Sequence, residues 1–107
     1  MKIRILDRKL NKIISDARKL QAEYGKRNAA LIIQRYNELD NIPNLGMMVK
    51  CRVGRCHPLK GNYQGKYALD LEHPLRMIIE PVFESESKDI NEVVFVSIVK
   101  MEDYHGK

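Results

Sequence analysis

The chain has 107 residues, of which 44% are hydrophobic and 31% are charged, a composition typical of one soluble globular domain and not of a disordered chain. Its first twenty residues, MKIRILDRKLNKIISDARKL, carry charges throughout, which argues against a signal peptide or a membrane span in this stretch. We therefore expect a cytoplasmic protein with a single domain over residues 1–107, in which Cys51 and Cys56 are free thiols.

The charge is positive and unevenly spread. The net charge is +5; residues 1–36 hold ten Lys and Arg against three acids, and residues 49–66 hold five against none. The acids gather instead in ESESKDINE, residues 84–92. Such a basic surface indicates a polyanionic partner, most often nucleic acid, although a basic protein with a solvated face fits the same charge count.

The first part of the chain has the pattern of a strand followed by two helices. KIRIL, residues 2–6, is short and rich in Ile, which predicts a strand. Apolar residues then recur at helical spacing and predict an amphipathic helix: Leu6, Leu10, Ile13, Ile14, Ala17 and Leu20. Gly25 separates this helix from a second one, which ends before Ile42 and Pro43. The second stripe consists of Ala29, Ile32, Ile33, Tyr36 and Leu39. The short link between the two predicts an antiparallel helical hairpin.

The rest of the chain has β character. YALDLE (67–72) alternates apolar and polar residues, and LRMIIEPVF (75–83) predicts a second strand after a His-Pro turn. The apolar run EVVFVSIVKM (92–101) is typical of a strand buried on both faces, and a further short strand near 51–57 is compatible with the pattern. This order predicts an α+β domain whose helical hairpin packs on one face of a small, mainly antiparallel sheet, with the other face left for a partner.

Few side chains carry chemistry, and the sequence contains no phosphate-binding Gly-rich loop, CxxC pair, HExxH or GxSxG motif. Cys51, Cys56 and a pair of histidines suggest zinc, but C-x4-C lacks the second pair of ligands that a structural zinc site needs. Buried or half-exposed thiols are the better interpretation, and we expect no metal and no cofactor.

Cleavage of RNA is the second chemistry that these residues allow. Attack by a ribose 2′-hydroxyl needs a base for that hydroxyl, an acid for the leaving 5′-oxygen, and cations for the charge that builds on the phosphate. Histidine suits both proton transfers. Lys60, Lys66 and Arg76 supply positive charge, and Tyr104 supplies a hydroxyl or a ring on which a base stacks.

The same residues also have structural interpretations. His57 precedes Pro58 and can cap a turn, Arg76 can pair with a strand acid such as Glu72, and a terminal histidine such as His105 is usually solvated. From the residues alone, RNA cleavage and simple binding of nucleic acid or protein both stay open.

The stretch CHPLKGNYQGKYALDLEHPLRMIIEP, with DYH near the end of the chain, resembles the HigB-type toxins of the RelE/ParE superfamily. The family pattern runs H-x-L-K-G-x-x-x-G, then an Arg on a following strand, then D-Y-H. The matching positions are His57, Leu59, Lys60, Gly61, Gly65, Arg76, Asp103, Tyr104 and His105. The chain departs from the pattern at Tyr67-Ala68, where many HigB toxins have Trp-Ser, and at HPLR (73–76), which leaves the role of His73 open.

The resemblance implies a RelE-like fold and the toxin of a type II toxin–antitoxin system. Such a toxin is a ribosome-dependent mRNA interferase, a metal-independent endoribonuclease that cuts message in the ribosomal A site by 2′-hydroxyl attack and so inhibits translation. The implied partners are a cognate HigA-type helix-turn-helix antitoxin in a hetero-oligomeric complex, the ribosome and mRNA, with no membrane.

The resemblance also implies roles for individual residues. The implied catalytic group is His57, Asp103, Tyr104 and His105, with Lys60 and Arg76 on the RNA phosphate and Lys66 as a further phosphate-binding candidate. We expect proton transfer by His57 and His105, with Asp103 orienting or assisting one of them. On an ideal strand Asp103 and His105 share a face and Tyr104 points away, so Tyr104 joins the group only if the strand end twists or lies in a groove.

Two other functions compete with this hypothesis. ParE-like relatives of the same fold poison DNA gyrase and generally lack the terminal D-Y-H that is present here. A non-catalytic RNA- or protein-binding module is the third alternative. It predicts that His57→Ala, or truncation after Met101, leaves activity intact.

Overall fold

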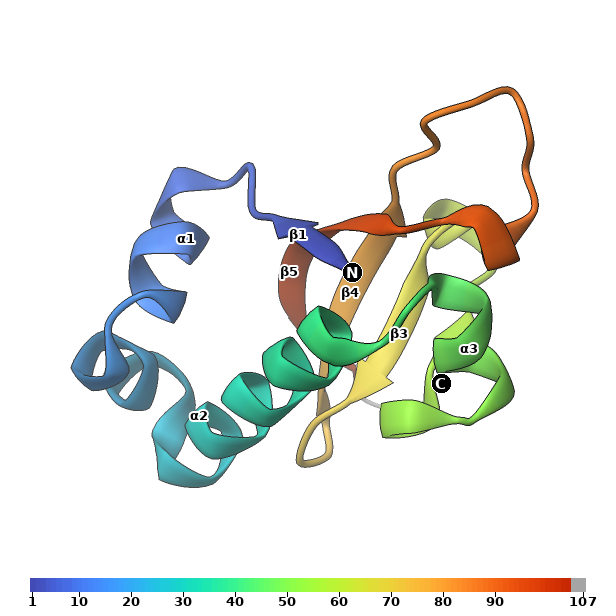
Figure 1. The fold of residues 1–107 in the computed structure, drawn as a ribbon. Helices are drawn as coiled ribbons and strands as arrows, with labels where there is room; N and C mark the ends of the chain where they lie inside the picture. The colour runs from blue at the N-terminus through green and yellow to red at the C-terminus, as the bar shows by residue number, and fades with distance from the viewer. Residues whose placement is uncertain (105–107) are drawn as a thin grey trace.

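The computed structural model describes residues 1–104 as an α+β fold with an N-terminal strand, helices, and the remaining strands of one sheet (Figure 1). The helices are α1 (Arg8–Ile14), α2 (Ala17–Asn41) and α3 (Leu45–Lys50), with short 3-10 turns η1 (Val53–Arg55), η2 (Gly61–Tyr63) and η3 (Ile90–Glu92). The strands are β1 (Lys2–Arg4), β2 (His57–Pro58), β3 (Tyr67–Asp70), β4 (Leu75–Pro81) and β5 (Phe95–Asp103).

The five strands form one mixed sheet in the order β1-β5-β4-β3-β2. The pairs β2–β3, β3–β4 and β4–β5 are antiparallel, which confirms the predicted mainly antiparallel sheet. The N-terminal strand β1 lies at one edge and pairs parallel to β5, with Ile3 opposite Val96. The extra short strand that was compatible with the pattern near 51–57 is present as the two-residue β2, which begins at the last residue of that range.

The first predicted helix is wrong in its length. The apolar stripe from Leu6 to Leu20 is continuous in the sequence, but α1 ends at Ile14 and a new helix begins after Asp16. The reason is local, because the Asp16 carboxylate accepts hydrogen bonds from the backbone N–H groups of Arg18 and Lys19 and so caps a new helix.

The second predicted helix is confirmed at both ends, because α2 consists of two helical segments that meet at Gly25, and the second of them ends before Ile42. Helix α2 runs to Asn41 and ends before Ile42, and Gly25 interrupts it with a non-helical conformation (φ 82°, ψ 163°) that glycine adopts easily. The helix α3 was not predicted; its N-cap Asn44 accepts from the Met47 N–H at 2.8 Å. A six-residue helix is too short to show a helical period in the sequence.

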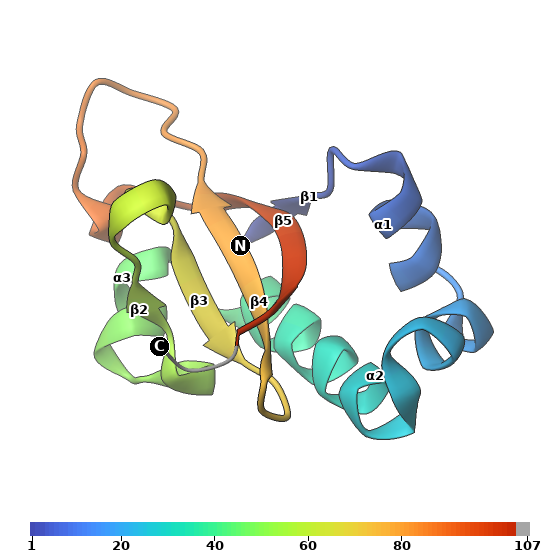
Figure 2. The same cartoon turned by 180° about the vertical axis from the view of Figure 1, so that it is seen from behind.

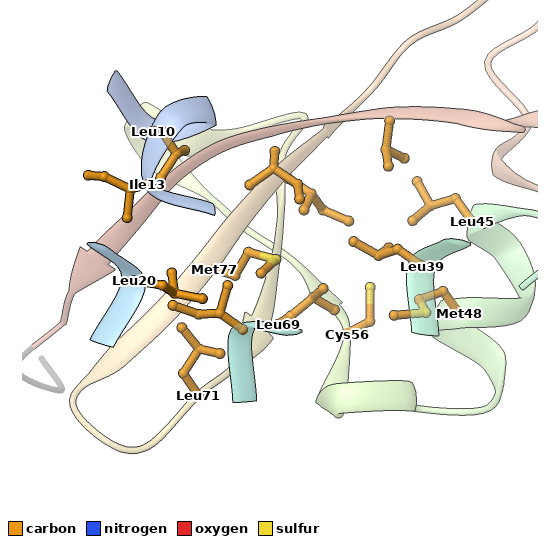
Figure 3. Close-up of a cluster of buried hydrophobic side chains, with 14 of the residues drawn as sticks. Leu10, Ile13, Leu20, Leu39, Leu45, Met48, Cys56, Leu69, Leu71 and Met77 are labelled. Atoms are coloured by element: carbon orange, nitrogen blue, oxygen red, sulfur yellow. The ribbon is translucent and has the colours of Figure 1, made fainter. Parts of the chain in front are cut away.

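Helices α2 and α3 cover one face of the sheet, and α1 packs against α2 (Figure 1). The core lies between these two layers, where Leu20 of α2, Met77 of β4 and Leu69 of β3 come together with side chains of α1 and α3 (Figure 3). Burying such side chains contributes roughly 1.5–3 kcal/mol each relative to leaving them exposed. No helix within residues 1–104 has the length and apolar character needed to cross a membrane.

The opposite face of the sheet is visible from behind, where no helix crosses β3, β4 or β5 (Figure 2). A β-bulge decides which side chains of β5 reach that face. Ile78 pairs with Lys100 but Ile79 pairs with Ile98, so Val99 is an extra residue in β5. In a regular strand Ile98, Lys100 and Glu102 would all lie on the same face. Because of the extra residue, Ile98 packs into the core, whereas Lys100 and Glu102 lie on the opposite face of the sheet.

Candidate functional site

A cleft of about 550 Å³ opens where the ends of β3 and β4 meet the segment around β2 and η2. Its lining residues are Arg55, His57, Pro58, Leu59, Lys60, Tyr63, Asp70, Leu71, His73, Pro74, Leu75, Arg76 and Tyr104. Of the residues singled out in the sequence, the fold brings together His57, Lys60, Arg76 and Tyr104 in this one cleft, and His73 joins them.

His57 is held in one tautomer by its own segment. Its Nδ1 lies 2.7 Å from the backbone oxygen of Arg55, and because a carbonyl only accepts, Nδ1 carries the hydrogen. The other ring nitrogen, Nε2, is then the acceptor of the neutral ring. His57 directly follows the buried Cys56 and pairs with Ala68 of β3, so the ring is fixed at the start of a strand. This is the arrangement that a general base needs.

The segment before His57 is itself anchored to the cleft. The Arg55 side chain donates from Nε and Nη2 to the two carboxylate oxygens of Asp70, at 2.7 and 3.0 Å. This bidentate pair joins η1 to the end of β3 and raises the pKa of the Arg55 guanidinium, first through the hydrogen bond to Asp70 and then through its charge. Both side chains are largely exposed, so the pair contributes little to stability.

Arg76 lies in the cleft but already has a carboxylate partner. Its Nε and Nη2 donate to Glu102 Oε1 at 2.9 and 2.6 Å, across the β4–β5 pair. The structural interpretation, in which Arg76 pairs with a strand acid such as Glu72, is confirmed in kind but wrong in the residue, because the acid is Glu102 of β5 and Glu72 pairs with Arg27 of α2. The side chains of Arg76 and Glu102 are only 16% and 19% exposed, so this ion pair is shielded from solvent.

Tyr104 lies in the cleft and Asp103 does not, so the two neighbours point in different directions, as the alternation of a strand predicts. Its ring lies under the Arg76 guanidinium, with Cζ 4.2 Å from the ring centroid, and its N–H donates to the Pro74 carbonyl at 2.7 Å. Asp103 is opposite Leu75 in the β4–β5 register and does not line the cleft. The predicted role of His105 falls outside residues 1–104.

The two predicted lysines are placed differently. Lys60 follows β2, is exposed, and lines the cleft. Lys66 does not line it; its ammonium lies 3.2 Å from a carboxylate oxygen of Glu80 in β4. Among residues 1–104, no ion pair is formed by Lys60, so its charge is available to an anion in the cleft.

Two contributors to this region, Tyr63 and Glu102, were missed from the sequence. The Tyr63 hydroxyl donates to Glu102 Oε2, and Lys100 Nζ donates to the Tyr63 hydroxyl at 3.3 Å. Glu102 could have been found only from the strand register. Asp70, Arg76 and Glu102 lie opposite one another, in a row across the adjacent strands β3, β4 and β5. Finding that row requires the position of the bulge at Val99, which no local pattern specifies.

The pKa of Glu102 is lowered. Partial burial by itself raises it, but hydrogen bonds from Tyr63 and Arg76 and the charges of Arg76 and Lys100 outweigh that effect. The carboxylate is therefore ionised at neutral pH. It neutralises the Arg76 charge while fixing the plane of the guanidinium.

The zinc hypothesis finds no cluster to support it. Cys51 is exposed and Cys56 is buried, and both are free thiols, as expected. Burial raises the pKa of the Cys56 thiol to about 12, so it behaves as a small apolar core residue. Within the described 104 residues, no group of three His, Cys, Asp or Glu side chains is close enough to hold a metal ion.

The cleft thus combines a histidine with an acceptor nitrogen, an oriented arginine, aromatic rings, and a lysine that forms no ion pair within residues 1–104. Such a set can bind a phosphate, stack an unpaired base and accept a proton. Comparisons of the chain with protein-family models, with curated protein sequences and with solved structures give no match.

Proposed function

We propose that this protein is the toxin of a type II toxin–antitoxin system, a ribosome-dependent mRNA interferase of the HigB type in the RelE/ParE superfamily. The observation that supports it best is the position of the His57 ring, whose Nδ1 lies 2.7 Å from the backbone oxygen of Arg55. Its Nε2 is left as a proton acceptor in the same cleft as Lys60 and Arg76. The order of a strand, helices and a mainly antiparallel sheet agrees with the fold expected from the resemblance.

In the proposed reaction, the mRNA strand lies across the cleft with one phosphate near Lys60. His57 Nε2 takes the proton from the 2′-hydroxyl of the preceding ribose as the 2′-oxygen attacks phosphorus. The bond between phosphorus and the 5′-oxygen breaks, and that oxygen takes a proton from His105, the other residue for which proton transfer is expected; we assign His105 as the acid because His57 is assigned as the base. The products are a 2′,3′-cyclic phosphate and a 5′-hydroxyl, and no co-reactant is consumed.

Charge on phosphate builds during this attack, and fixed cations stabilise it. Lys60 lines the cleft and forms no ion pair with any residue in the described range 1–104, so it supplies one such charge. Arg76 keeps donors after its bonds to Glu102, because only Nε and Nη2 are used there. Tyr104, stacked on Arg76, offers a ring on which a neighbouring base can stack.

The exposed basic residues of the N-terminal part support a large polyanionic partner, and we assign ribosomal RNA to this role. Seven cations lie exposed there: Lys2, Arg4, Arg8, Lys9, Lys12, Arg18 and Lys19. The two acids of the same stretch, Asp7 and Asp16, face the N-termini of α1 and α2 as capping groups. In this proposal a HigA-type antitoxin neutralises the toxin in a hetero-oligomeric complex.

The test is inducible expression in a bacterium of wild type, His57→Ala and His105→Ala, followed by mapping of cellular mRNA ends. We expect wild type to arrest growth and to leave in-frame cuts in translated messages, and both variants to lose them. Glu72→Gln is the matched control, because it alters an exposed ion pair outside the cleft and should behave as wild type. Circular dichroism on each purified variant checks that it is folded.

Growth arrest with intact messages would reject the nuclease and favour a gyrase-type target. Cuts that persist in His57→Ala would reject the assigned base. Folded wild-type protein that neither arrests growth nor cuts RNA would reject the toxin hypothesis as a whole.

A further inference from the structure

Glu102 does not line the cleft, but it hydrogen-bonds two residues that do, Tyr63 and Arg76. Its two oxygens serve different partners: Oε1 accepts from Arg76, and Oε2 accepts from the Tyr63 hydroxyl. These partners come from β4 and η2, so one carboxylate on β5 joins three separate segments of the chain.

The bond to Glu102 fixes the plane of the Arg76 guanidinium. Two N–H groups on one edge, at Nε and Nη2, point to the same oxygen at 2.9 and 2.6 Å. Two aromatic rings lie near the guanidinium, with Cζ 4.2 Å from the centroid of Tyr104 and 5.9 Å from that of Tyr63. The N–H groups of Arg76 that do not bind Glu102 lie on the opposite edge of the guanidinium. Arg76 can therefore donate to a ligand in one orientation.

Glu102 has a parallel effect on Tyr63. The hydroxyl donates to Glu102 and accepts from Lys100 at 3.3 Å, so both of its hydrogen-bonding functions are in use. What Tyr63 offers to the cleft is therefore its ring. The Glu102 carboxylate offsets the charge of Arg76. The pair therefore adds little positive potential to the cleft, and its main effect is to hold the Arg76 guanidinium in one orientation.

We propose that Glu102 is a positioning residue of the candidate active site. It orients the Arg76 guanidinium toward the scissile phosphate and holds the Tyr63 ring so that Tyr63, Arg76 and Tyr104 form one stacking platform for an unpaired nucleobase. This inference rests on the proposed RNA cleavage. Glu102 touches neither the phosphate nor the base, so it acts on the reaction only through its partners.

The experiment is single-turnover cleavage of mRNA on programmed ribosomes, at several toxin concentrations, with wild type, Glu102→Ala, Glu102→Gln and Tyr63→Phe. For Glu102→Ala we expect the maximal rate to fall about 10- to 100-fold, because small misplacements of catalytic groups have effects of this size. The half-saturating toxin concentration should change little, since Lys60 and the exposed basic surface remain. Glu102→Gln keeps an oxygen for Arg76 and should recover part of the rate.

Tyr63→Phe removes only the hydroxyl that donates to Glu102 and leaves the Arg76–Glu102 pair in place, so we expect a smaller fall in rate. Glu72→Gln is the matched control, because it removes a carboxylate charge from the exposed Arg27 pair. A wild-type maximal rate in Glu102→Ala, or an effect on half-saturation alone, would overturn the positioning role.

A second readout needs no activity. In an NMR spectrum of ¹⁵N-labelled protein, the Arg76 Nε–H signal should exchange slowly with solvent in wild type and in Glu102→Gln and quickly in Glu102→Ala, with the backbone amides unchanged. Fast exchange in wild type would overturn the inference. Wild-type protein that cleaves no RNA would reject the proposed function, while this signal would still decide whether Glu102 orients Arg76.

Discussion

The guanidinium carbon of Arg76 lies 4.2 Å from the centroid of the Tyr104 ring, which brings the last described residue of the chain onto the side chain of a central strand. The contact explains how a residue so close to the chain end belongs to the cleft. After the bulge at Val99, the even-numbered residues of β5 from Lys100 onward face away from the core, and Tyr104 continues that series.

The contact between the Arg76 guanidinium and the Tyr104 ring predicts that the ring of Tyr104, and not its hydroxyl, supports cleavage. Tyr104→Phe retains the ring and should keep most of the cleavage rate. Tyr104→Ala should lose about 3- to 30-fold, the range of a cation–π contact. Cleavage assays on programmed ribosomes measure both. Equal losses in the two variants would instead assign the role to the hydroxyl.

His57→Ala should lower the maximal cleavage rate by about 100-fold or more, the range of general base catalysis, with little change in the binding of RNA. The ring packs in a half-exposed position, so we expect the thermal unfolding midpoint to stay near that of wild type. Rate and midpoint are measured on the same preparation. A folded variant with an unchanged rate would remove His57 from the mechanism.

Lys60 and Lys66 should contribute unequally to RNA affinity. Lys60 is exposed in the cleft, whereas Lys66 lies outside it beside Glu80. We expect Lys60→Ala to reduce the slope of log affinity against log salt by about 1, as for one lost phosphate contact, and Lys66→Ala to reduce it less. Fluorescence anisotropy with a 2′-O-methyl oligonucleotide over a KCl series measures the slopes, with Lys88→Ala as the control. The reverse order would place the phosphate elsewhere on the surface.

Glu102 should also make stability depend on pH. The pKa of Glu102 is lowered in the folded protein from 4.5. The ionised carboxylate therefore stabilises the fold above about pH 4.5, and this stabilisation is lost as the pH falls through the pKa of Glu102 in the folded protein. Glu102→Gln should reduce the free energy of unfolding by about 1–3 kcal/mol at pH 7, the usual effect of breaking a shielded hydrogen-bonded charge. The difference should shrink toward pH 3. Urea titrations from pH 7 to 3 test this, and a difference that does not depend on pH would contradict it.

The two thiols should differ in reactivity. Burial raises the pKa of the Cys56 thiol to about 12, whereas Cys51 is exposed at the end of α3. A disulfide reagent at pH 8 should label one thiol per chain quickly and the second only in denaturant. Cys51→Ser should abolish the fast phase. A fast phase that persists in that variant would show that the Cys56 site opens readily.

Much of the fold could be predicted because its patterns are local. The alternation in β3, the apolar stripe of α2 and the run in β5 each reflect burial of one face or both, and burial is encoded residue by residue. The boundary at residues 15 and 16 could not be predicted from periodicity, because one capping aspartate outweighs a continuous apolar stripe. Helix α3 is too short to leave a periodic signal.

By itself, the sequence determined the element types, the basic face and the motif that contains His57, Lys60 and Arg76, because these depend on local composition and spacing. The tertiary structure decided which of these side chains meet. The bulge at Val99 places Glu102 on the same face as Arg76, and the parallel pairing of β1 with β5 adds the fifth strand to the sheet. Lys66 forms an ion pair with Glu80 outside the cleft. Strand register and long-range ion pairs join residues far apart in the chain, so no local pattern contains them.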